Sequence, residues 1–176
     1  MPIALIIMLF AIPYCATQSF LVSYVDAKDV AVQVSIFFPL YAMILFILRF
    51  SFKSKFDKWS FGVFFWAACI SATISMLGLT FLYNNWIMVI AAIFMAGGYG
   101  IMCSVCQSTA ILLAGPGKRG IANSTYYIGL DLGMTLGPFL GGLLYDAVPS
   151  AYFYPVLMIC VPVSIVIYSI WHKKCV

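Results

Sequence analysis

Eight of the nine Lys and Arg residues lie on one side of a membrane if each of six long apolar runs crosses it. The runs cover residues 2–25, 32–49, 61–82, 86–113, 121–145 and 151–171. A helix needs about 20 apolar residues, each rising about 1.5 Å, to cross about 30 Å of hydrocarbon. Every run is close to that length or longer. We therefore predict an all-α membrane protein with six transmembrane helices in one domain, residues 1–176.

The segments between the runs predict the orientation of the chain. The 83–85 and 146–150 links carry no basic residue, and the 25–31 link carries only Lys28. The 50–60 segment, the 114–120 segment and the tail carry the others, with Arg49 at the edge of its run. Because cationic loops stay in the cytoplasm, both termini are predicted to be cytoplasmic.

The composition supports a lipid environment. The chain is 65% hydrophobic and 8% charged, whereas a soluble domain is typically about 25% charged. The net charge of +4 is divided among short loops, which argues against nucleic-acid binding and leaves the bilayer as the expected partner. The first run lacks a basic leader and a small-residue cleavage site, so we interpret it as a retained helix.

The sequence offers little for catalysis or metal binding. Cys103 and Cys106 form a CxxC inside an apolar run, but no second ligand pair accompanies it, so neither a metal nor a cofactor is predicted. His172 is the only histidine, and the chain has no Glu. These absences exclude a buried Ser–His dyad and an HExxH zinc site. We therefore predict that the chain is not an enzyme.

Polar side chains form stripes along three of the runs. We expect five of them to line a substrate cavity: Tyr14, Gln18, Tyr99, Gln107 and Tyr127. The alternative is that they form hydrogen bonds between helices, as in many membrane bundles.

Asp131 is the one acidic residue deep in an apolar run, about 15 Å from the end of its helix. A charge at that depth costs about 2.5–3.5 kcal/mol or more, so the carboxyl group must be protonated, paired or in contact with water. Burial favours the neutral form of a carboxyl group, which makes proton binding reasonable. The chain has no Lys or Arg at this depth. Proton coupling and a structural or gating pair both remain open.

Glycines recur at every fourth position around Asp131. Residues at this spacing let two helices approach closely, and a proline within the helix favours a bend. The residues predicted to pack the helix in this way are Gly129, Gly133, Gly137, Pro138 and Gly141.

The block from Arg119 to Gly142 resembles helix 11 of major facilitator superfamily transporters, and it is most similar to proton-coupled drug and metabolite exporters. Residues 18–24, 37–42 and 96–100 resemble helices 7, 8 and 10 in the same order. The resemblance implies one six-helix half of the family's fold, built as a 3+3 inverted repeat. It also implies a plasma or inner membrane location, a small-molecule substrate, and a cytoplasmic gating loop with Arg49, Asp57 and Lys58.

The chain departs from the family pattern in two respects. Phe50 replaces the usual proline of the gating loop, and the resemblance covers six helices of a family that has twelve. Residues 137–142 also resemble a motif of the first half, but Gln107 stands about where that half has an arginine. We therefore expect the C-terminal half of a proton-coupled exporter that works by alternating access, with the N-terminal half as a missing partner. The alternative is a truncated or partner-dependent fragment without transport activity of its own.

Overall fold

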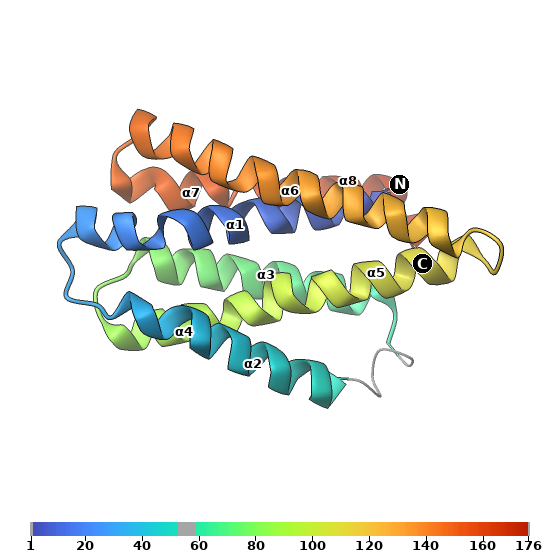
Figure 1. Ribbon diagram of the computed structural model, residues 1–176, viewed down its shortest axis with the longest axis horizontal. Coiled ribbons are helices and arrows are strands. Elements are labelled where there is room, and N and C mark those ends of the chain that lie inside the picture. The colour runs from blue at the N-terminus through green and yellow to red at the C-terminus, as the bar shows by residue number, and fades with distance from the viewer. Residues whose placement is uncertain (1, 53–58, 176) are drawn as a thin grey trace.

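Six helical spans that are long and apolar enough to cross a membrane make up the bundle, which confirms the predicted all-α membrane fold. The computed structural model describes residues 2–52 and 59–175, and no strand occurs within those ranges. The spans are Pro2–Lys28, Val34–Ser51, Phe61–Thr80, Asn85–Ala114, Arg119–Ala147 and Ser150–Trp171. Successive spans run in opposite directions along the bundle (Figure 1).

Three spans are single uninterrupted helices, and three are composite. The uninterrupted ones are α1 (Pro2–Lys28), α3 (Phe61–Thr80) and α6 (Arg119–Ala147). In the second span, the 3₁₀ turn Val34–Ile36 leads into α2 (Phe37–Phe52). The fourth span consists of α4 (Asn85–Met95), the π-helical segment η2 (Ala96–Gly100) and α5 (Ile101–Ala114). The sixth consists of η3 (Ser150–Tyr152), α7 (Phe153–Leu157) and α8 (Cys160–Cys175).

Local chemistry sets the ends of the fourth span. The side chain of Asn84 accepts a hydrogen bond of 3.0 Å from the backbone N–H of Ile87, which caps the start of α4. Gly115 ends α5 with a φ of 72°, a left-handed conformation that glycine adopts without a steric penalty. The span is thus defined at both ends by its own sequence.

The helix α1 lies at the centre of the bundle and packs against α6, α8 and α5 (Figure 1). Beside it, the rings of Phe65 and Tyr168 stack with their centroids 4.3 Å apart and join α3 to α8. The two spans least buried within the bundle are those of α2 and α6, which lie on opposite flanks. Both flanks thus present long helices with largely unburied faces.

The two ends of the bundle differ in charge. Lys118 and Arg119 lie in the turn between α5 and α6, at the same end as the exposed Arg49 of α2. The opposite end carries Asp26, Asp29, Asp146 and Lys28. Among the described residues, no other Asp, Glu, Lys or Arg lies at that end. Lys53, Lys55 and Lys58 lie outside the described residues.

Lys28 has a structural role that accounts for its position away from the other cations. Its ammonium group donates a hydrogen bond to the backbone carbonyl of Thr80, the last residue of α3. It also lies 5.1 Å from the ring centroid of Tyr24 and 5.7 Å from that of Tyr83. The last carbonyls of a helix lack partners within the helix, so Lys28 stabilises the end of α3.

We expect Lys28→Met to lower the free energy of unfolding by about 2 kcal/mol, because it removes a charged hydrogen bond and two cation–π contacts. Thermal unfolding in detergent measures the change. Asp26→Asn, a nearby change at an exposed side chain, is the control and should leave the midpoint unchanged. Equal midpoints for Lys28→Met and the wild type would show that the contact does not stabilise the bundle.

Candidate functional site

The glycines of α6 place this helix directly against α1. A Cβ atom built on Gly133 would lie 2.7 Å from the backbone oxygen of Met8, and one on Gly137 would lie 2.7 Å from that of Ile12. Gly129 and Gly141 make similarly close approaches to α1, at Ala4 and Phe20. With one face of α6 fixed in this way, the opposite face is turned outward.

The outward face of α6 divides into a polar and an apolar sector. Since each residue of a helix turns it by about 100°, Ser124, Tyr127, Asp131 and Thr135 fall within one narrow sector. The next sector around the helix is apolar and exposed, and it contains Ile121, Ile128, Leu132, Phe139 and Leu143. The polar sector is suited to contact with water or polar groups, and the apolar sector is suited to contact with lipid.

Asp131 lies at the centre of the polar sector and near the middle of the 29-residue helix. Its side chain is exposed and forms no salt bridge or hydrogen bond with the described part of the chain. Thr135 donates its hydroxyl hydrogen to the backbone oxygen of Asp131 at 2.9 Å, so this hydroxyl does not partner the carboxylate. The carboxylate is therefore available to a proton, a ligand or another chain.

Gln107, Asn123 and Tyr127 form a neutral hydrogen-bonded cluster, whose nearest member along α6 is one turn before Asp131. The Nε2 group of Gln107, on α5, donates to the Oδ1 atom of Asn123 at 3.1 Å and to the hydroxyl oxygen of Tyr127 at 3.2 Å. Both hydrogens of the Gln107 amide are thus used within the cluster. The Tyr127 hydroxyl hydrogen remains as a donor about one helical turn from Asp131, and the Asn123 amide remains as a donor about two turns away.

Asn123 was missed by the sequence analysis. Its position, four residues before Tyr127 and eight before Asp131, was the available signal, because residues four apart are neighbours on a helix surface. The spacing alone did not reveal that Gln107 would reach it from the neighbouring helix.

Two of the predicted cavity residues meet in a separate aromatic cluster. The rings of Tyr14, on α1, and Tyr99, in η2, stack with centroids 4.1 Å apart and an interplanar angle of 12°. Tyr41, on α2, joins them with its ring centroid 5.2 Å from that of Tyr14. Tyr41 was not among the predicted cavity residues. The cluster links three spans by contacts between rings.

The remaining predicted residues lie apart from these clusters. Gln18 is exposed on α1, and its side chain forms no hydrogen bond within residues 2–52 and 59–175. Arg49 is exposed near the end of α2, whereas Asp57 and Lys58 lie outside the described residues. Pro138 lies within α6, which remains one helix from Arg119 to Ala147.

The sequence model of the Major Facilitator Superfamily matches residues 66–173, more than half of the 176-residue chain. The matched region includes the whole of α4, α5 and α6, and with them Gln107, Asn123, Tyr127 and Asp131. No curated protein and no solved structure matches the chain.

Proposed function

The chain belongs to the major facilitator superfamily, and from this premise we propose that it forms the C-terminal lobe of a proton-coupled exporter of small molecules. With its six apolar spans, it is an integral membrane protein of a transport family. In such transporters the substrate and ion sites lie near the bilayer midplane, between structural repeats that rock against each other. The lobe would provide one wall of that site.

The observation that carries this proposal is the exposed carboxylate of Asp131 halfway along a membrane span. Lipid is a poor environment for such a group, because a charge at the bilayer centre costs about 2.5–3.5 kcal/mol or more. A water-filled cavity, by contrast, hydrates the carboxylate and gives protons access to it. The cluster of Gln107, Asn123 and Tyr127 extends the same surface with hydrogen-bonding groups for a substrate.

The partner lobe is proposed from the burial of the spans. The spans of α2 and α6 are the least buried, and α6 combines a polar with an apolar sector on its free face. A second six-helix lobe placed over the polar sector would enclose the cavity, while lipid covers the apolar sector. In the aromatic cluster, the half-buried rings of Tyr14 and Tyr99 would add apolar contacts for a substrate, with the buried Tyr41 behind them.

The orientation follows from the charged ends. The end with Arg49, Lys118 and Arg119 is proposed to face the cytoplasm of a cell membrane, because loops rich in Lys and Arg are retained there. Both termini would then be cytoplasmic. An exporter in this orientation would use a proton gradient directed toward the cytoplasm.

A second candidate is a partner-dependent membrane protein with no transport activity of its own. The same exposed face of α6 favours it, since a surface of this kind is suited to association with another chain. Two measurements on the product of the native locus separate the candidates, namely its intact mass and its pH-gradient-driven uptake of model organic substrates in proteoliposomes. Gradient-driven uptake supports the exporter. If the native product shows no such uptake, whether its mass is that of this chain alone or larger, the exporter is contradicted.

The division of α6 into two sectors predicts different water access at neighbouring positions. A cysteine introduced by Thr135→Cys should react with a membrane-impermeant maleimide in intact membranes, because it would face the cavity. A cysteine introduced by Leu132→Cys should remain unlabelled, because it would face lipid. Because the wild-type chain already has six cysteines, the labelling of each variant is measured as the increase over the wild type. Equal labelling at the two positions would contradict the proposed cavity.

A further inference from the structure

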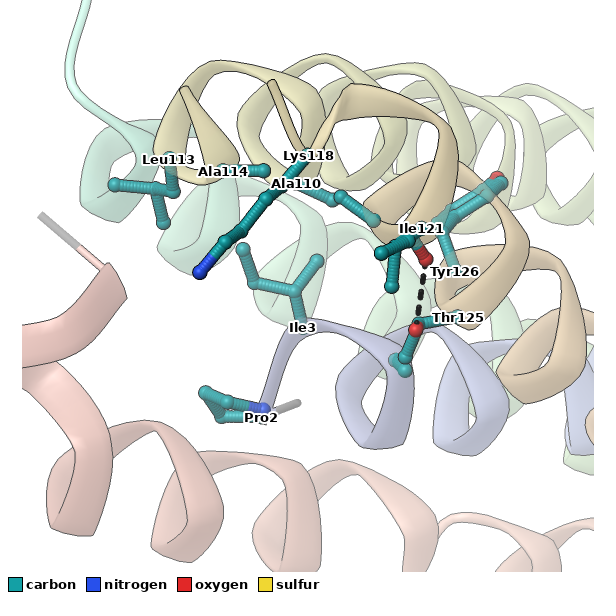
Figure 2. A pocket seen from close by; sticks show the side chains of 11 residues that line it. Pro2, Ile3, Ala110, Leu113, Ala114, Lys118, Ile121, Thr125 and Tyr126 are labelled. Atoms are coloured by element: carbon teal, nitrogen blue, oxygen red, sulfur yellow. Dashed lines mark hydrogen bonds between the residues drawn. The ribbon is translucent and has the colours of Figure 1, made fainter. Parts of the chain in front are cut away.

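A pocket of about 370 Å³ lies at the end of the bundle that carries Lys118, away from the polar sector of α6. It is formed where the first turn of α1, the last turns of α5 and the first turns of α6 meet (Figure 2). Its walls are largely hydrocarbon and include Ile3, Ala110, Leu113 and Ile121. An apolar hollow at this position lies where a helix bundle meets the surface of the bilayer.

The polar side chains in the wall are already hydrogen bonded. Thr125 donates its hydroxyl hydrogen to the backbone oxygen of Ile121 at 2.9 Å, shown as the dashed line in Figure 2. Tyr126 donates its hydroxyl hydrogen to the backbone oxygen of Cys103 at 2.8 Å. Neither hydroxyl hydrogen is therefore free for a ligand. A ligand part inside the pocket must accordingly be hydrocarbon, because a polar group there would lose its hydrogen bonds to water.

Lys118 gives the pocket a cationic rim. Its side chain extends along the open side of the pocket, with the ammonium group between Leu113 and Pro2 (Figure 2). No carboxylate among the described residues forms a salt bridge with it. Lys118 also precedes α6, whose start has no side-chain cap, so the partial positive charge of that helix end adds to the ammonium charge.

We propose that this pocket binds an anionic phospholipid, with one acyl chain in the apolar hollow and the phosphate on Lys118. The apolar hollow matches the acyl chain, and Lys118 matches the phosphate, in both chemistry and position. Lys118 lies in the turn between two membrane spans, where headgroups are found, and the hollow extends from there between three helices. A bound chain would sit between α5 and the closely packed pair of α1 and α6.

Binding to the full-length chain in detergent, measured by native mass spectrometry, tests the proposal. The probes are dioleoyl phosphatidylglycerol, which is anionic, and dioleoyl phosphatidylcholine, which has the same chains and no net charge. The wild type should retain the anionic lipid at least about fivefold more than the neutral lipid, because the ammonium group attracts an uncompensated phosphate at low salt, whereas the choline cation balances the phosphate of phosphatidylcholine. Equal retention of the two lipids would overturn the proposal.

Two pairs of variants examine the two halves of the site. Lys118→Gln should abolish the preference for phosphatidylglycerol, whereas Lys118→Arg should keep it. Ala110→Phe, which fills the hollow, should abolish retention of the anionic lipid, whereas Ala67→Phe, on an exposed position of α3, should not. A preference unchanged by both Lys118→Gln and Ala110→Phe, in variants that unfold at the wild-type temperature, would overturn the assignment. Displacement of the lipid by inorganic phosphate would identify a site for free anions and would also overturn it.

Discussion

Asp131→Asn is expected to reduce pH-gradient-driven flux to background, a loss of at least about tenfold, while substrate binding is retained. Asparagine has nearly the same shape as aspartate but cannot take up and release a proton. The exposed side chain makes no hydrogen bond or salt bridge within the described residues, so its replacement removes no internal contact. Flux of the complete transporter in proteoliposomes, with and without a pH gradient, measures the effect.

Asp146→Asn is the matched control, because Asp146 is exposed at the end of the same helix, where water is available without a cavity. Its flux should stay close to that of the wild type. Unchanged gradient-driven flux in Asp131→Asn would exclude the coupling role. Loss of binding together with flux would instead assign Asp131 to substrate contact.

The double variant Gly133→Ala, Gly137→Ala is expected to destabilise the bundle by about 4 kcal/mol, or about 2 kcal/mol for each site. Each new methyl carbon would lie 2.7 Å from a backbone oxygen of α1, at Met8 and at Ile12. A backbone oxygen within a helix cannot move aside as a flexible side chain can, so the two helices must separate. Thermal unfolding in detergent measures the loss.

Gly142→Ala controls for the change of residue type on the same helix. A Cβ atom there would have its nearest neighbour, Cζ of Phe20, at 3.5 Å, which is an ordinary contact. Alanine also favours a helix over glycine by about 1 kcal/mol, so this variant should be neutral or slightly stabilised. If the double variant proved as stable as Gly142→Ala, the close approach of α1 and α6 would not contribute to stability.

The number and type of the helices could be predicted from the sequence because the physical requirement is simple. A span needs only sufficient apolar length, and every span meets this requirement by itself. Interruptions within a span depend on neighbouring helices, and the sequence does not show these. The segment Ala96–Gly100 has the composition of a glycine-rich packing face, yet it forms a π-helical turn against α3.

The candidate site was predictable only in part, for a related reason. Helical spacing placed Tyr127 and Asp131 on one surface, because both belong to the same uninterrupted helix. The contact of Gln107 with Tyr127, and the meeting of Tyr41 with Tyr14, depend on how spans pack side by side. Tyr99 and Gln107 were expected on one face of a regular helix. The structure places Tyr99 in the π-helical segment and Gln107 beyond it, and it gives them different partners.

The π-helical turn lets the fourth span hold one extra residue between α4 and α5. Such a turn holds one more residue than an α-helical turn of the same kind, and each residue turns a helix by about 100°. Deleting one residue between Ala96 and Gly100 would remove that extra residue and convert the turn to α-helix, so α5 would face nearly the same direction relative to α4 as before. Gln107 would still face Asn123 and Tyr127, whereas a deletion between Ile101 and Val105, in regular α-helix, would turn Gln107 away from them by about 100°. The segment Ala96–Gly100 is therefore a place where the fourth span can lose one residue without changing which surface of α5 meets α6.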